Sequence, residues 1–199
     1  MAGGGAGAFT VREPRVTSSE VVYENRWLRV REDRLERGDG SPGLYSVVEK
    51  RPAALIVPLH ADGTLTLVEQ YRHPIAQRRW EFPQGALDPA PGEATPSPEL
   101  SAEEIARTEL AEETGLRAAR LERLSRLHFA YGISNQHVDV WLATELAEGP
   151  QDLESEEEGL RVGRFARVEV EEMARAGTMS DAASVAAVGL LCLGGLAGR

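Results

Sequence analysis

The alternation of apolar and polar positions along the chain predicts an α/β protein. Two apolar runs, at 54–59 and 65–70, flank an Asp62-Gly63 pair that is typical of a hairpin turn. Their β-branched and leucine-rich composition indicates buried strands, so we expect the two runs to pair and to form the core of a sheet. Later patterns predict three further strands, at 123–129, 138–144 and 161–168.

The segments that precede these strands have a different composition. Residues 1–8 are almost entirely glycine and alanine, and we expect a disordered tail. Residues 9–48 mix β-branched with charged residues and carry a turn signal at 38–40, which predicts a small N-terminal β region. Residues 49–199 then form one main domain, because the chain is too short to favour a second independent core.

A helix is predicted to begin after Ser101. Ser101 followed three residues later by Glu104 is a capping-box pattern, and Gly115 is a typical helix end. Between these signals one stripe of the helix is apolar and the opposite stripe is acidic. The other segments predicted here are a proline-rich loop at 85–98 and two closing helices at 170–175 and 182–193.

The charge of the chain narrows the class of partner. Acidic residues outnumber basic ones by 32 to 22, and the formal net charge is -10. This excess argues against a nucleic-acid duplex or an anionic membrane surface as partner. The single cysteine, Cys192, lies in an apolar run too short to span a bilayer. We expect a buried thiol without a disulfide and, from it, a cytoplasmic protein.

Three glutamates of the predicted helix are candidates for metal binding. Glu112 and Glu113 follow Glu109 by three and four residues, so the carboxylates share one face. Like charges at this spacing destabilise a helix by about 0.2 to 0.5 kcal/mol per pair, which a divalent cation would reverse. Oxygen ligands select Mg²⁺ or Mn²⁺ over Zn²⁺. The alternative interpretation is an ordinary solvated helix face.

The surroundings of these glutamates carry a resemblance to a known family. The segment 109–116, Glu-Leu-Ala-Glu-Glu-Thr-Gly-Leu, resembles the second half of the Nudix box, and the loop with Gly85, Gly92 and Glu93 resembles its first half. Four further segments are similar to parts of the ADP-ribose pyrophosphatases of this family: 69–74, 80–85, 159–162 and 180–185.

The resemblance implies a fold and an activity. The fold would be an α/β/α sandwich around a mixed β-sheet, with the small N-terminal β region pairing across a homodimer. The activity would be hydrolysis of the diphosphate bond of a small nucleotide substrate, ADP-ribose or a related nucleoside diphosphate sugar, to AMP and a sugar phosphate. The implied cofactor is Mg²⁺, with Mn²⁺ as an alternative.

The resemblance also implies roles for the carboxylates around the helix. Glu109 and Glu113 would be the main metal ligands, and Glu112 a further ligand or an orienting catalytic group. Glu93 in the loop and the backbone carbonyl near Gln84 would be additional metal ligands.

An acidic loop at 154–158 falls where related enzymes place a catalytic base. Its register against Leu160-Arg161-Val162 favours Glu156 as the base and Glu158 as a metal ligand, both on one bridging water. The alternative is that this loop is a solvated turn.

Four residues are candidates for substrate binding. Arg72 has a planar donor fork that suits a diphosphate or a ribose, with a surface salt bridge as the alternative. Glu81 would hold adenine or stiffen the pocket. Trp27 and Tyr131 could stack on a base, although aromatic residues are more often part of a core.

Departures from the family pattern leave two other functions open. Thr108 stands where the box has an arginine, and Arg107, one place earlier, points about 100° away on the helix. The loop 86–98 carries an insertion, which loops accept at modest entropic cost. Tyr131 and the segment Phe82-Pro83-Gln84-Gly85 are more typical of dinucleoside polyphosphate hydrolases, so that activity is one alternative. A nucleotide-binding regulator without turnover is the other.

Overall fold

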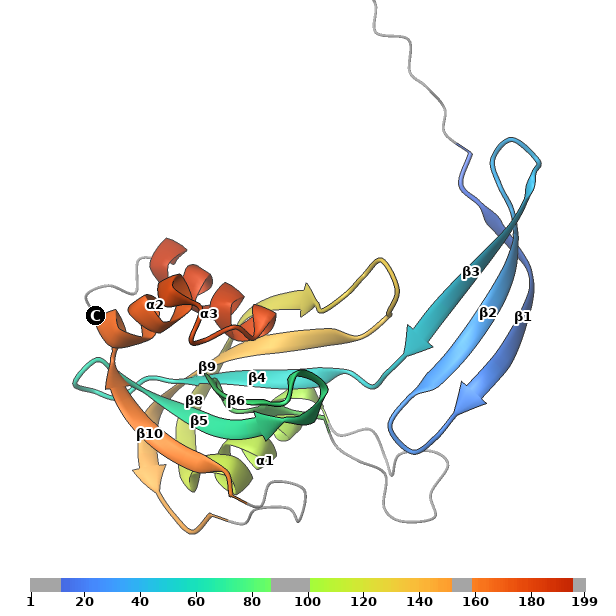
Figure 1. The fold of residues 1–199 in the computed structure, drawn as a ribbon. Coiled ribbons are helices and arrows are strands. Elements are labelled where there is room, and N and C mark those ends of the chain that lie inside the picture. The colour runs from blue at the N-terminus through green and yellow to red at the C-terminus, as the bar shows by residue number, and fades with distance from the viewer. Residues whose placement is uncertain (1–11, 87–100, 152–158, 195–199) are drawn as a thin grey trace, which may run out of the picture.

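The N-terminal strands form a small sheet of their own. The computed structural model describes residues 12–86, 101–151 and 159–194, so the predicted tail at 1–8 lies outside the described residues. Three antiparallel strands stand away from the rest of the molecule (Figure 1), in the order β1-β2-β3. This confirms the predicted N-terminal β region, with a turn in which Gly40 has φ +85°. The strands are β1 (Arg15–Glu24), β2 (Arg29–Glu36) and β3 (Pro42–Glu49).

A mixed four-stranded sheet forms the centre of the main domain, in the order β7-β4-β9-β8. β4 pairs in parallel with β9 and antiparallel with β7, and β8 pairs antiparallel with β9. The strands are β4 (Ala53–Pro58), β7 (Gln84–Gly85), β8 (Leu116–His128) and β9 (His137–Glu148).

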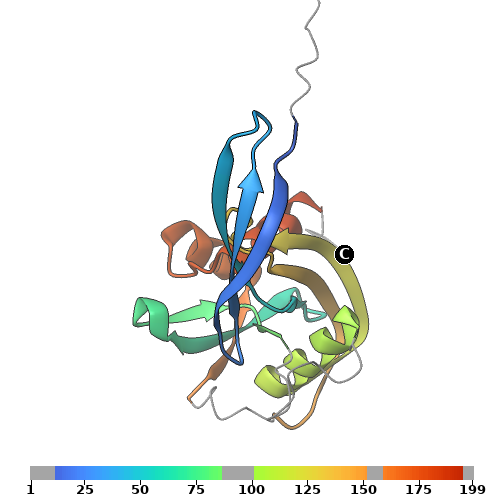
Figure 2. The same cartoon turned by 90° about the vertical axis from the view of Figure 1, so that its right-hand side faces the viewer.

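Helices cover the strands from both sides. Leu55 and Val57 of β4 pack into a core with α2 (Arg167–Ala176) and α3 (Ala182–Leu193). Ala54 and Ile56, which alternate with them, pack against α1 (Ala102–Thr114). Figure 2 gives the same arrangement from another side, with α1 away from the two closing helices. These layers are the expected α/β/α sandwich.

The predicted pairing of the runs 54–59 and 65–70 is wrong, although the turn between them forms. His60 N donates to Thr64 O at 2.9 Å, but beyond one bridge between Leu59 and Leu65 the strands separate. β4 has no free edge for a second strand, because β9 occupies one edge and β7 with the carbonyl of Pro83 the other. A separate antiparallel sheet, β10-β5-β6, contains β5 (Thr64–Arg72), β6 (Gln77–Glu81) and β10 (Arg161–Ala166).

Two smaller expectations also differ from the structure. β8 begins at Leu116, directly after α1, instead of at 123, because its first residues pair with the far end of β9. Cys192 is exposed near the end of α3, where its thiol lies beside Arg167 and Glu171.

A 3₁₀ turn at His73–Ile75 joins β5 to β6. Within the described ranges, no helix has the length and apolar character needed to cross a membrane.

Candidate active site

The helix α1 carries two of its glutamates into the protein. The expected capping box forms, with Ser101 and Glu104 bonding to each other's backbone N–H, and Gly115 ends the helix at φ +71°. Glu109 is 7% exposed and Glu113 is 1% exposed. Two carboxylates one helical turn apart repel each other and lose hydration on burial, so this face needs compensating positive charge or hydrogen-bond donors.

The short strand β7 supplies close contacts to both carboxylates. Gln84 N donates to Glu113 Oε2 at 3.0 Å. Gly85 lies so close to the carboxylate of Glu109 that a Cβ at this position would overlap it. The antiparallel pairing of Gly85 with Ala54 of β4 places this backbone over the helix. The structure therefore joins Gln84, Glu109 and Glu113 in one place.

The donors at this place fit a hard divalent cation. They are carboxylate and amide oxygens, the ligands that Mg²⁺ and Mn²⁺ prefer. Gln84 Oε1 is buried and has no hydrogen-bond partner among the described residues. In the parts of the chain that the structure describes, no three His, Cys, Asp or Glu side chains are grouped as a metal site. Glu112 is half-buried, while Glu93, Glu156 and Glu158 lie outside the described residues.

Arg107 contacts its own helix and the strand that follows it. Its guanidinium donates to the carboxylate of Glu103 at 2.8 Å and to the carbonyl of Ala118 at 2.7 Å. These bonds hold Arg107 against the start of β8.

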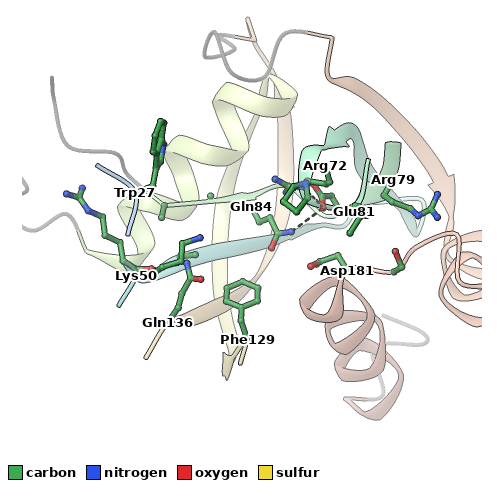
Figure 3. Close-up of a pocket in the computed structure, with 16 residues that line it drawn as sticks. Trp27, Lys50, Arg72, Arg79, Glu81, Gln84, Phe129, Gln136 and Asp181 are labelled. Carbon is green, nitrogen blue, oxygen red and sulfur yellow. Dashed lines mark hydrogen bonds and ion pairs between the residues drawn. The ribbon is translucent and has the colours of Figure 1, made fainter. Parts of the chain in front are cut away.

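A cavity of about 590 Å³ opens beside β7. Figure 3 shows Gln84 between Trp27 on one side and Arg72 with Glu81 on the other, with Arg79 beyond that pair. The lining is both aromatic and charged, which suits a ligand with a base and phosphates. Besides these residues, the wall includes Lys50, Arg51, Phe129, Gln136 and Asp181.

Arg72 and Glu81 form a bidentate ion pair at their end of the cavity. Arg72 Nε donates to Glu81 Oε2 at 3.2 Å, and Nη2 donates to Oε1. Burial raises the pKa of Glu81 above its ordinary value, and the charge of Arg72 opposes the rise. Gln84 Nε2 also lies 3.5 Å from Glu81 Oε2, which connects the ion pair with β7.

The two aromatic residues predicted to stack on a base lie in different places. Trp27 lines the cavity from the turn between β1 and β2, with the guanidinium of Arg26 4.5 Å from its ring centroid. Tyr131 is 87% exposed and lies outside this cavity. It borders a second hollow of about 350 Å³ near α3. Phe129 lies in the walls of both.

Sequence reasoning missed several residues of the cavity wall. Phe129 was expected only as the end of a strand, and no local signal distinguishes it from a core residue. Asp181 had a signal, because it caps α3 by accepting from Ser184 N at 2.7 Å, but a cap does not reveal that it faces a cavity. Lys50 and Gln136 meet here only through the parallel pairing of β4 with β9.

Comparisons with known proteins agree with this geometry. Residues 15–48 match the model of a nucleoside diphosphate sugar hydrolase N-terminal domain, and residues 49–187 match the NUDIX domain. An ADP-ribose pyrophosphatase of Mycobacterium tuberculosis is 34% identical over 172 residues, which cover 86% of this chain and 79% of that protein. An ADP-ribose pyrophosphatase of Bacillus subtilis is 26% identical over 147 residues, covering 73% and 75%.

A solved structure extends the likeness to the whole fold. The crystal structure of an ADP compounds hydrolase superposes with a TM-score of 0.78 at 26% identity, covering 94% of this chain and 98% of that one. The NUDIX match spans the helix with Glu109 and Glu113, the strand β7 and most of the cavity wall. The chain therefore belongs to the Nudix family of hydrolases.

Proposed function

We propose that the protein hydrolyses the diphosphate bond of ADP-ribose or a related nucleoside diphosphate sugar, giving AMP and a sugar phosphate. The observation that carries the proposal is the contact of β7 with Glu109 and Glu113 at the edge of a cavity lined by aromatic and cationic side chains. The activities named for the relatives from M. tuberculosis and B. subtilis point to the same substrate class.

The carboxylates of α1 would hold Mg²⁺, or Mn²⁺ in its place. Glu109 and Glu113 are the main ligands in this proposal, with Glu112, Glu93 and the backbone carbonyl of Gln84 as additional donors or orienting groups. A bound divalent ion supplies neutralisation of the phosphate oxygens and lowers the pKa of a water molecule. The hydrogen bond from Gln84 N to Glu113 holds this carboxylate in position.

We assign proton removal from the attacking water to the acidic loop at 154–158. Glu156 acts as the base and Glu158 as a metal ligand, both on one bridging water. Both residues lie outside the described structure, so their assignment depends on their place in the sequence.

The cavity supplies the contacts for the rest of the substrate. Arg72 binds a phosphate or ribose oxygen, while Glu81 fixes the plane of its guanidinium. Trp27 offers its ring to the base at the other end. Tyr131, which favoured a dinucleoside polyphosphate as substrate, lies outside the cavity, so the structure gives that alternative no added support.

We further propose that the protein is a cytoplasmic homodimer. The N-terminal sheet supports a dimer because it exposes large apolar side chains at Val21, Val22, Tyr23, Leu44 and Tyr45. Light scattering of the purified chain measures its oligomeric state, and a monomeric mass at micromolar concentration would exclude the dimer.

The proposed activity is tested by measuring hydrolysis of ADP-ribose, GDP-mannose, diadenosine polyphosphates and nucleoside triphosphates with Mg²⁺ or Mn²⁺. The wild type is compared with Glu113→Gln and with Glu103→Gln, an exposed position on the same helix. We expect ADP-ribose turnover that falls at least about 100-fold in Glu113→Gln alone. If the wild type binds ADP-ribose but does not hydrolyse it, the protein is a nucleotide-binding regulator and not an enzyme.

A further inference from the structure

Asp181 presents a carboxylate oxygen to the wall of the cavity. Its Oδ2 caps α3 by accepting from Ser184 N at 2.7 Å, and this bond fixes the orientation of the side chain. The other oxygen, Oδ1, accepts no hydrogen bond from any residue that the structure describes. Asp181 lines the cavity at the end that holds Arg72 and Glu81, and Figure 3 shows it near that pair. One acceptor of this wall is therefore available to a ligand.

The charge of Asp181 is not matched by an ion pair within the described residues. Arg72 is bonded to Glu81 through both Nε and Nη2. Arg79, which Figure 3 shows beyond that pair, donates to the side chain of Gln77 and to a backbone carbonyl of its own strand, β6. Burial is the largest cause of the raised pKa of Glu81, and the charge of Asp181 adds to the rise. The wall thus keeps a negative charge at this end.

The order of the groups along the cavity indicates which half of the substrate reaches Asp181. The diphosphate that is cleaved must lie at the metal ligands, and Gln84 bonds to one of them, Glu113. Trp27, on one side of Gln84 in Figure 3, takes the base in the proposed function. Asp181 lies on the other side, so it meets the part of the substrate that follows the second phosphate.

The chemistry of a carboxylate determines what this part of the substrate must be. An ionised carboxylate only accepts hydrogen bonds, so a group that binds Oδ1 must donate one. The hydroxyls of a sugar are donors, whereas an ionised phosphate offers acceptors and a charge of the same sign. A sugar is therefore favoured next to Asp181, and a further phosphate is disfavoured.

We propose that Asp181 is a specificity-determining residue that accepts a hydrogen bond from a hydroxyl of the sugar half of the substrate. By its charge it also selects nucleoside diphosphate sugars over nucleoside triphosphates and dinucleoside polyphosphates. The inference rests on the proposed function and deepens it, because it names the residue that distinguishes a sugar from a phosphate beyond the cleaved bond.

Two variants change the group that faces the cavity while they retain the helix cap. Asp181→Asn caps α3 with its amide oxygen on Ser184 N, which puts an amide donor in the place of Oδ1. Asp181→Ser uses its single oxygen for the cap and leaves no acceptor in the cavity. The matched control is Asp62→Asn, because Asp62 also accepts from a backbone N–H, that of Thr64 at 3.1 Å, but lies in an exposed turn outside the cavity.

The experiment measures kcat/KM with Mg²⁺ for ADP-ribose, for ATP, and for an ADP ester that carries a butyl group in place of the sugar. We expect Asp181→Ser to lose about 10- to 100-fold on ADP-ribose, the range for one hydrogen bond to a charged group, and to change little on the butyl ester. In Asp181→Asn the preference for ADP-ribose over ATP should fall about 100-fold, because the repulsion of phosphate is also removed. Asp62→Asn should keep both preferences of the wild type.

Unchanged preferences in both variants would overturn the inference, and so would an equal fall on all three substrates, which would mean that Asp181 only maintains the shape of the site. If Asp181→Ser does not fold, the ratio of ADP-ribose to ATP in Asp181→Asn decides the question.

If the wild type hydrolyses none of the three compounds, the proposed function fails. Calorimetric binding of ADP-ribose and of the butyl ester to the wild type and to Asp181→Ser then tests the inference separately, because a contact with a hydroxyl needs no turnover. Weaker binding of ADP-ribose alone would support the inference, and equal affinities of the two proteins for ADP-ribose would overturn it.

Discussion

The guanidinium of Arg72 forms a bidentate ion pair with the carboxylate of Glu81, in which Nε lies 3.2 Å from Oε2 and Nη2 donates to Oε1. Glu81 is 2% exposed, whereas Arg72 keeps over a third of its side chain in contact with solvent at the cavity. A buried carboxylate is tolerated when an opposite charge bonds to it. The pair therefore has two effects, because it compensates the burial of Glu81 and aims Arg72 at the cavity.

Removing Arg72 is expected to make stability depend more strongly on pH. Burial already raises the pKa of Glu81 above 4.5, and Arg72 opposes this, so the pKa rises further in Arg72→Met. The variant should lose about 1.5 to 3 kcal/mol of unfolding free energy near neutral pH. A raised carboxyl pKa costs stability as pH rises through it, so the deficit should shrink toward acid pH, where Glu81 is protonated.

Urea unfolding over a series of pH values measures this deficit. The double variant Arg72→Met/Glu81→Gln has no buried charge at this place and should recover most of the loss. A deficit that stays constant with pH would show that Arg72 acts through packing alone.

Gly85 is expected to tolerate no side chain. A Cβ at Gly85 would overlap the carboxylate of Glu109, so Gly85→Ala must displace either that carboxylate or β7. We expect Mn²⁺ affinity and kcat to fall about 10- to 100-fold. Calorimetric titration with Mn²⁺ measures the first, and Gly132→Ala, where a Cβ meets nothing within 4 Å, is the control. Normal Mn²⁺ binding by Gly85→Ala would place the metal away from Glu109.

Ser184 of α3 is expected to stabilise the strand end that carries Glu81. Its hydroxyl oxygen accepts from Phe82 N at 3.0 Å, and both residues are fully buried. Ser184→Ala leaves this N–H without an acceptor, so we expect a loss of about 1 to 3 kcal/mol in urea unfolding. Ser46→Ala, at an exposed position of β3, should stay within about 0.5 kcal/mol of the wild type. Equal stability of the two variants would contradict the prediction.

Asp139 is expected to stabilise the protein only while it is ionised. A hydrogen bond from Arg126 lowers the pKa of this buried carboxyl below 3.8, so its contribution is complete above that value and disappears as pH falls through the lowered pKa. Asp139→Asn should lose about 1 to 3 kcal/mol near neutral pH and almost nothing in strong acid. Thermal unfolding against pH tests this, with Glu122→Gln, an exposed carboxyl paired with Arg120, as the control expected to be near zero.

Features that depend on near neighbours could be predicted from the sequence. The bounds of α1 follow from Ser101, Glu104 and Gly115, and the shared face of Glu109 and Glu113 follows from the helical repeat. The segments around them that resemble the Nudix box predicted the fold class and the family. All of these signals act within a few residues, where the backbone geometry of a helix is the same in any protein.

The partners of each strand were decided by the tertiary structure. The apolar runs at β4 and β5 read as one hairpin, yet they belong to different sheets because the edges of β4 are filled by β9 and β7. A preference for one partner over another is a small difference among many packing and hydrogen-bond energies, and no single run of residues carries it.

The composition of the cavity wall was also decided by the tertiary structure. The sequence by itself determined which side chains could bind a metal or a diphosphate, because that chemistry belongs to the residue types. Only the tertiary structure placed Phe129 and Asp181 in the wall and left Tyr131 outside it. These positions join residues far apart in the chain, and they depend on strand order and register summed over the whole fold.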